Sequence, residues 1–430
     1  MRPRFHLLLW VPAIVVALIL AVGSARLGTE DSRAEGVRAV EEATVTFEIR
    51  VPETTPDGAA IWISGDRVEL GAWNGRGVSA KRGADGLYRA AVTFPKGTVF
   101  QFKVTRGGWD TVEKGPAGEE IANRAFRVDG PDELCAVDVA NWRDQGTEPK
   151  LSSTLSGNVR VHESFSSAFV EPRDVLVLLP PEYDASSSRY PVLYMHDGQN
   201  LFDRATSFLG IEWGVDETVG QLLQAGRLDS VIVVGVDNSG AERIYDYTPV
   251  PDMGLSSRVG DANAENVDDT DADGPSGRAV GGGADAYERF LVEELKPFVD
   301  REYRTLPGRE FTGLAGSSLG GLVSLYIGLE HPETFSRIGV VSPSVWWADD
   351  FILRHVAQRG KRDLRIWLDM GSAESPEGIT EARALRDALV EAGWSLGDDL
   401  HYLEVDGAPH NESAWADRVD EMLEYLFPPD

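Results

Sequence analysis

Residues 311–321 of the chain, FTGLAGSSLGG, join a short apolar run to a serine held between glycines, and a helix-like segment, 319–330, follows at once. A strand that turns sharply into a helix needs small residues around the turn, and it lifts the central hydroxyl above the carboxyl edge of a sheet. The positive end of the following helix favours an oxyanion that develops there. We therefore predict that Ser318, rather than its neighbour Ser317, is a catalytic nucleophile. The alternative is a tight glycine turn with a capping serine.

Continuous apolar runs recur on both sides of this stretch, and helix-like segments such as 285–300 lie between them. Strands buried on both faces lose their polar–apolar alternation, and strands interleaved with helices indicate a largely parallel sheet. With the serine turn above such a sheet, the pattern predicts an α/β-hydrolase fold over residues 155–430, a mostly parallel sheet flanked by helices. The predicted strands are 175–179, 192–195, 231–234, 311–315, 338–341, 366–368 and 402–405.

A nucleophilic serine requires a general base, and in this fold the base lies on a loop beyond the last strand. Of the seven histidines, His410 follows the final predicted strand and precedes a terminal helix. We predict that His410 is the base; the alternative is an exposed loop histidine that caps the helix.

The acid that orients the base should lie between Ser318 and His410, after the penultimate strand. Two carboxylates occur there: Asp369 ends the strand, whereas Glu374 lies on the following loop. A loop carboxylate can reach the imidazole, so Glu374 is the predicted acid and Asp369 the alternative, which would instead anchor backbone amides of the loop.

An oxyanion hole needs two backbone amides. Leu319, directly after the nucleophile, should supply one. The loop after His196 should supply the other, with Gln199 as the donor and Gly198 allowing close approach of the backbone. A plain glycine turn is the alternative for this loop.

Four stretches of the C-terminal part are similar to the esterase family that includes esterase D, enterochelin esterases and feruloyl esterases. The resemblance covers most of residues 155–428. It implies carboxylic-ester hydrolysis by a Ser-His-acid triad with no metal and no organic cofactor. The family's acid usually follows a Gly-Thr pair, where this chain has Gly371-Ser372-Ala373 before Glu374. The four stretches are His196–Phe202, Phe298–Thr305, Gly316–Gly321 and Ser342–Trp347.

Residues 44–140 show a different pattern, because apolar and polar residues alternate in short runs such as 44–49 and 88–94 between Gly, Pro and Asp. This alternation predicts a small antiparallel β-sandwich. Polar segments at 28–43 and 141–154 are expected to be linkers.

The front domain resembles a family 20 starch-binding module in Leu70–Asn74, Phe100–Lys103 and Asn123-Arg124. The resemblance implies glucan binding, with Trp73 stacking on a sugar ring and Lys103 donating hydrogen bonds. The second stacking tryptophan is replaced by Val112-Glu113, and Trp109 is the candidate substitute. The alternative is that these tryptophans are buried, as is common for the residue type.

Residues 1–27 resemble a targeting segment: Arg2 and Arg4 precede the apolar run Leu7–Val22, and small residues follow. The pattern predicts export, with the segment acting as a cleaved signal peptide or as a membrane anchor. The net charge of −29 argues against nucleic acid as a partner.

An acidic, glycine-rich insertion is expected at residues 252–284. Its stretch Asp269–Gly274 has the spacing that opens a calcium loop, but Val280 stands where the bidentate acid is required. We therefore expect a solvated surface insertion and no metal site.

Together these features predict an exported serine esterase that acts through an acyl-enzyme on a small-molecule or polysaccharide-linked ester, with the front domain directing it to glucan. Two alternatives stay open on the sequence alone: an acyltransferase that uses the same triad, and a non-catalytic carbohydrate-binding protein.

Overall fold

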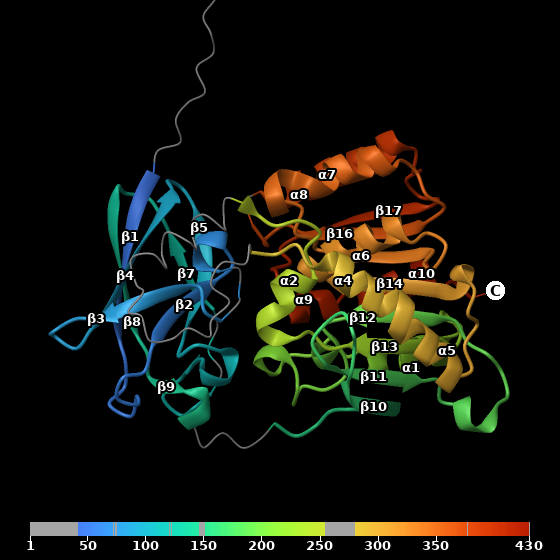
Figure 1. Ribbon diagram of the computed structural model, residues 1–430, viewed down its shortest axis with the longest axis horizontal. Coiled ribbons are helices and arrows are strands. Elements are labelled where there is room, and N and C mark those ends of the chain that lie inside the picture. The colour runs from blue at the N-terminus through green and yellow to red at the C-terminus, as the bar shows by residue number, and fades with distance from the viewer. Residues whose placement is uncertain are drawn as a thin grey trace, which may run out of the picture. The chain divides into compact units, whose positions relative to one another are not determined.

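The computed structural model describes residues 42–429 apart from 72, 74, 120, 122, 146–150, 254–279 and 376. Residues Glu41–Asp430 form one compact unit, which contains an all-β part and an α/β part (Figure 1). Three predicted segments lie outside the described residues: the targeting segment 1–27, most of the linker 28–43, and the stretch Asp269–Gly274 that has the spacing of a calcium loop. Among the residues that are described, no helix combines the length and apolar character needed to cross a membrane.

The all-β part is built around one seven-stranded sheet in the order β7-β5-β2-β3-β4-β1-β8. Alternation along β1 buries Val45, Phe47 and Ile49 and turns the residues between them outward, which is why the sequence pattern located this strand. Neighbouring strands pair antiparallel except for β1 and β8, which are parallel. The strands are β1 Glu42–Arg50, β2 Ile61–Gly65, β3 Val78–Arg82, β4 Tyr88–Pro95, β5 Val99–Thr105, β7 Arg124–Arg127 and β8 Asp132–Asp138.

A two-stranded ladder of β6, Glu113–Lys114, and β9, Asn141–Trp142, extends this domain beyond the predicted boundary. The Trp142 side chain is fully buried in the same hydrophobic core as Phe47. The predicted linker 141–154 is therefore wrong in its first residues, because burial of Trp142 ties the segment to the sandwich. The first strand also begins two residues earlier than expected, at Glu42.

The α/β part contains an eight-stranded sheet in the order β10-β11-β13-β12-β14-β15-β16-β17. The pairs β10–β11 and β11–β13 are antiparallel, and all other neighbours are parallel. Each predicted apolar run lies in or overlaps a strand, so the α/β-hydrolase fold is confirmed. The strands are β10 Asn158–Phe165, β11 Arg173–Leu179, β12 Val192–His196, β13 Ile232–Val236, β14 Thr312–Ser317, β15 Arg337–Val341, β16 Arg365–Gly371 and β17 Leu400–Val405.

Helices cover both faces of this sheet (Figure 1). Tyr194 of β12 packs into a core with residues of α4 to α8, whereas Leu193 and Met195 pack into a second core with α1 and α10. The helices are α1 Val215–Ala225, α2 Arg243–Asp246, α4 Ala284–Arg289, α5 Lys296–Glu302, α6 Leu319–Glu330, α7 Trp347–Arg359, α8 Gly378–Ala392, α9 Glu412–Ala416 and α10 Val419–Leu426, with a π-helical turn, Phe290–Leu295, between α4 and α5.

The C-terminal end of the predicted insertion 252–284 is packed rather than solvated. The amide of Asp252 donates to the carbonyl of Val280 over 3.0 Å. Gly281 has a φ of +84°, and a Cβ there would lie 2.4 Å from the Trp347 ring, so only glycine fits. Ala284 is buried and begins α4. The insertion is therefore shorter than expected at its C-terminal end.

Candidate active site

Ser318 stands at the junction between the central strand β14 and helix α6. Its backbone has φ 59° and ψ −122°, a sparsely populated conformation for a residue with a side chain. A Cβ at Gly316 would lie 2.9 Å from Cδ2 of His196 and from the carbonyl carbon of Gly320, so the turn requires glycine before the serine. The structure thus places Ser318, and not the almost fully buried Ser317, at the tip of a sharp strand–helix turn.

His410 and Glu374 are joined by a hydrogen bond of 2.7 Å between Nδ1 and Oε2. His410 lies on the loop between β17 and α9, and Glu374 on the loop between β16 and α8. Burial raises the pKa of Glu374, but the charge of His410 and the hydrogen bonds that the carboxylate accepts hold that pKa below its usual value. The ionised carboxylate accepts from Nδ1, so the other ring nitrogen, Nε2, is left as the proton acceptor.

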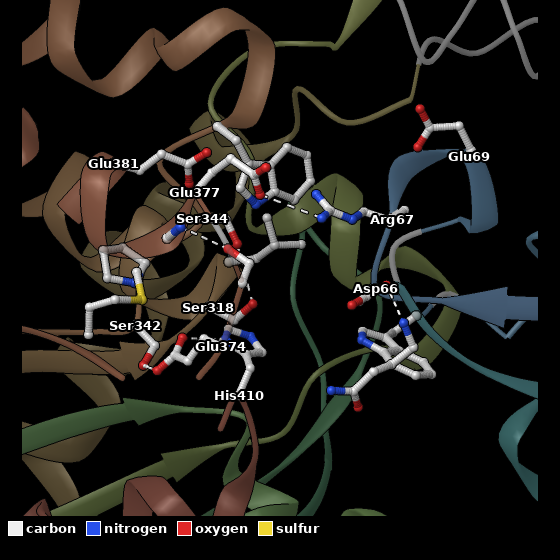
Figure 2. Close-up of a pocket in the computed structure, with 18 of the residues that line it drawn as sticks. Asp66, Arg67, Glu69, Ser318, Ser342, Ser344, Glu374, Glu377, Glu381 and His410 are labelled. Carbon is white, nitrogen blue, oxygen red and sulfur yellow. Dashed lines mark hydrogen bonds and ion pairs between the residues drawn. The ribbon is translucent and has the colours of Figure 1, made fainter. Parts of the chain in front are cut away.

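Ser318 and His410 both line two cavities, and Figure 2 shows them in the first of these. The hydroxyl of Ser318 is 3.3 Å from that of Ser344. The structure therefore brings together Ser318, His410 and Glu374 from three separate loops. The His410–Glu374 contact and the shared cavity agree with the predicted triad, and the catalytic roles of the three residues stay predictions.

The second oxygen of Glu374 is held by groups that the sequence did not reveal. Oε1 accepts hydrogen bonds from the Ser342 hydroxyl at 2.5 Å and from the amide of Gly371 at 2.7 Å. Ser342 in turn accepts from Arg418 at 2.6 Å and from Trp415 Nε1 at 3.0 Å. These side chains come from β15's end and the C-terminal helices, so no local pattern connects them with Glu374.

Asp369, the alternative acid, has another position. It is completely buried and accepts hydrogen bonds from Arg418 Nε at 2.9 Å and Trp367 Nε1 at 2.5 Å. The amide of Ser342 also contacts its Oδ1, at 3.3 Å. Asp369 therefore anchors the end of the sheet, and Glu374 is the carboxylate that meets His410.

The loop after β12 begins with Asp197 and continues as the turn Gly198–Asn200. A Cβ at Gly198 would lie 2.6 Å from the carbonyl carbon of Gly235, so glycine lets this loop rest against β13. Gln199 lines the same cavity as Ser318. Leu319 is the first residue of α6, where a backbone N–H has no partner within its helix. Both predicted oxyanion donors thus belong to the surroundings of Ser318.

Arg243, in the short helix α2, is a site residue that the sequence did not reveal. Its guanidinium forms two hydrogen bonds of 2.8 Å with the carboxylate of Asp197, at the start of the loop after β12. Burial lowers and Asp197 raises the pKa of Arg243, with a net rise. The side chain lines both cavities. Only the tertiary fold brings it there, because α2 lies outside every motif.

The two cavities share Ser318, His410, Trp73 and Arg243 and differ in the remaining wall. The first, of about 280 Å³, is called the acidic lobe. The second, of about 300 Å³, is called the aromatic lobe. The acidic lobe is further lined by Asp66, Arg67, Glu69, Trp346, Glu377 and Glu381. The aromatic lobe is further lined by Trp109, Gln199, Phe208, Trp213, Glu412 and Trp415.

The predicted sugar-binding residues divide into two groups. Trp73 and Trp109 are both half-buried, with ring centroids 5.9 Å apart, and Trp109 meets Phe208 of the α/β part edge to face at 5.0 Å. Lys103, by contrast, is fully buried and its Nζ donates to the carbonyl of Ile121. The prediction that Lys103 contacts sugar is wrong, because its side chain is buried inside the sandwich and its ammonium donates a hydrogen bond to the backbone there.

Residues 166–426 match the protein family described as "Putative esterase", and residues 42–129 match the family described as "Starch binding domain". These matches confirm both resemblances drawn from the sequence.

Individual proteins resemble one part of the chain or the other. Ferri-bacillibactin esterase BesA of Bacillus subtilis is 27% identical over 237 residues, which cover 53% of this chain and 71% of that protein. An alpha-amylase of Niallia circulans is 34% identical over 104 residues, which cover 24% of this chain and 8% of the amylase. The crystal structure of a BES protein from Bacillus cereus covers 64% of this chain and 98% of its own, with 23% identity and a TM-score of 0.48.

Proposed function

This chain belongs to the esterase family and is a carboxylic ester hydrolase, and from that premise we propose that it is an exported serine esterase that works through an acyl-enzyme. The observation that carries the mechanism is the 2.7 Å contact between His410 and Glu374 at the cavity lined by Ser318. A base that is oriented by a buried carboxylate next to a serine on a strained turn is the arrangement that activates a hydroxyl for attack.

In the proposed reaction the Ser318 hydroxyl attacks the ester carbonyl and gives its proton to Nε2 of His410. Glu374 stabilises the imidazolium, while the amides of Leu319 and Gln199 donate to the oxyanion. The carbon–oxygen bond to the alcohol breaks, and the alcohol leaves with the proton from His410. Water then attacks the acyl–Ser318 ester with His410 as base, which releases the carboxylic acid and restores the serine.

The test compares two neighbouring serines in the full-length protein. Ser318→Ala should abolish labelling by a fluorophosphonate probe and lower kcat for p-nitrophenyl acetate at least 10³-fold, the scale expected when a triad member is lost. Ser317→Ala is the matched control and should still be labelled. Equal rates for wild type and Ser318→Ala would reject the mechanism. Measuring the free acid released per alcohol separates hydrolysis from transfer to another hydroxyl.

For the front domain we propose glucan binding through Trp73 and Trp109. The match of residues 42–129 to a starch-binding family supports this, as does the pairing of two half-buried tryptophan rings at a cavity. Trp73→Ala should reduce retention of the protein on insoluble amylose. Trp62→Ala, a half-buried tryptophan of β2 that lines neither lobe, serves as the control. Undiminished retention of Trp73→Ala would contradict the assignment.

Export is proposed on the basic residues and apolar run of residues 1–22. Expression of the full-length chain in a bacterial host, followed by fractionation and N-terminal sequencing, tests it. Recovery of the protein outside the cytoplasm supports export, and a new N-terminus near residue 27 would identify cleavage. Retention of the intact chain in the cytoplasm would contradict the proposal.

A further inference from the structure

The acidic lobe has walls from both parts of the chain. Figure 2 shows Asp66 and Arg67, which follow β2 of the sandwich, across the cavity from Glu377 and Glu381 at the start of α8. Arg67 spans this gap, with its Nη2 3.5 Å from the Glu377 carboxylate. Ser318 lines the cavity between these walls. The sandwich is thus a wall of the catalytic cavity itself.

The charge of this lobe disfavours esters whose alcohol part is anionic. Four carboxyl groups line the lobe in addition to Glu374, which contacts His410: those of Asp66, Glu69, Glu377 and Glu381. Both guanidinium groups of the lobe already contact carboxylates, because Arg67 pairs with Glu377 and Arg243 pairs with Asp197. The excess charge is negative, so an anionic alcohol moiety would be repelled in a site partly screened from water. A neutral ligand carries no such penalty.

The remaining lining suits a polyhydroxy ring. Trp73 and Trp346 are half-buried and give the lobe flat apolar surfaces, while carboxylates form strong hydrogen bonds with hydroxyl donors. Burial raises the pKa of Asp66, and it raises that of Glu381 to about 7, helped by the charges of Asp350 and Glu377. A carboxyl that retains its proton donates as well as accepts, as a sugar hydroxyl does. The volume of about 280 Å³ is just below the usual range of ligand cavities, roughly 300–1,000 Å³, so the lobe is suited to a small ligand such as one ring.

We propose that the acidic lobe binds a neutral sugar residue whose hydroxyl carries the acyl group that Ser318 removes, so that the sandwich and the α/β part hold one substrate in one cleft. This inference rests on the serine esterase proposed above. The sugar hydroxyl leaves with the proton that His410 took from Ser318, and water later releases the acyl group as a carboxylic acid. The sandwich then recognises the reacting sugar itself, beyond any role in holding the enzyme on a polymer.

The experiment measures kcat/KM of the full-length protein on three acetate esters. These are an O-acetylated methyl glucoside, the corresponding glucuronate, which differs by one carboxylate, and p-nitrophenyl acetate. We expect the glucoside to be preferred over the glucuronate by at least tenfold. Glu381→Gln, Trp346→Ala and Trp73→Ala should each lower the ratio of glucoside to p-nitrophenyl acetate activity at least fivefold. Glu391→Gln, an exposed acid on the same helix as Glu381, should leave the ratio unchanged.

Ratios of two activities on one sample do not depend on how much of a variant is folded, so a destabilised variant still gives a result. Equal activity on glucoside and glucuronate, or ratios that match wild type in all three variants, would overturn the inference. The outcome for the esterase is separate: if wild type does not hydrolyse p-nitrophenyl acetate and is not labelled at Ser318, the proposed function fails. Activity on the aryl ester with none on the acetylated glucoside rejects the sugar site alone.

Discussion

Arg418 donates a hydrogen bond from Nε to Oδ1 of Asp369 over 2.9 Å, and both side chains are almost completely buried. The same guanidinium reaches the Ser342 hydroxyl, which in turn donates to Glu374. Burial raises the pKa of Asp369, and the positive charge of Arg418 opposes that rise. A buried ion pair therefore supports the carboxylate that contacts His410.

Removing the guanidinium should destabilise the protein strongly. Arg418→Met leaves Asp369 buried without its counter-charge, and breaking such a pair costs about 3–5 kcal/mol. The free energy of unfolding, measured in urea, should fall by that amount. Adding Asp369→Asn removes the unpaired charge and should recover part of the loss. A single variant within about 1 kcal/mol of wild type would contradict the expectation, since typical surface changes stay below that size.

Substitutions of Glu374 and Asp369 should have different effects, the first on catalysis and the second on stability. Glu374→Gln leaves the imidazole without an anionic partner and should lower kcat for p-nitrophenyl acetate by about 10²–10⁴, with KM little changed. Asp369→Asn, which changes the group that pairs with Arg418, should mainly lower the free energy of unfolding. If Asp369→Asn lost more kcat than Glu374→Gln in folded protein, the assignment of the acid would be reversed.

Glu412, a buried residue of the aromatic lobe, should make stability depend on pH. Burial raises its pKa to about 7, the charge of Asp197 adds to the rise, and His410 and Arg243 oppose it. The folded protein therefore keeps a proton that the unfolded chain loses near pH 4.5, so stability falls as the pH rises from about 4.5 to 7. The shift corresponds to at most about 3 kcal/mol.

Glu412→Gln should lack this decrease, because glutamine resembles the protonated acid. Urea unfolding should show equal stability of variant and wild type at pH 4 and a more stable variant at pH 8. The exposed Glu391→Gln is the charge-matched control and should follow wild type at both values. A wild type–variant difference that is the same at pH 4 and pH 8 would show that the Glu412 carboxyl titrates normally.

Gly198→Ala should disturb the loop after β12, residues 197–200, which carries the proposed oxyanion donor Gln199. The added Cβ would overlap the backbone of Gly235 and Val236, which cannot move without shifting β13. We expect a loss of about 1–3 kcal/mol from overpacking and at least a hundredfold fall in kcat as the Gln199 amide moves. Gly220→Ala is the control: the added methyl meets nothing within 4 Å inside α1, and alanine favours the helix. Normal kcat in Gly198→Ala would remove the loop from the mechanism.

Much of the architecture was predictable because it depends on short-range pattern. Alternation such as that along residues 44–49 marks strands with one buried face, and continuous apolar runs mark strands buried on both. The strand–turn–helix at Ser318 and the order of Ser318, carboxylate and His410 are likewise linear features. The predicted boundary of the sandwich was wrong at Trp142, because this side chain is buried by core residues that are far from it in the sequence.

The sequence by itself determined the two-part fold, the turn that presents Ser318 and the loop that carries His410, because periodicity and turn chemistry act over neighbouring residues. Only the tertiary structure decided which carboxylate contacts His410, since Asp369 and Glu374 are five residues apart and are separated by the direction of their side chains. It also decided that Lys103 is buried while Trp73 lines the cavity beside Ser318. Such placements arise where distant segments pack together, and no local pattern contains that information.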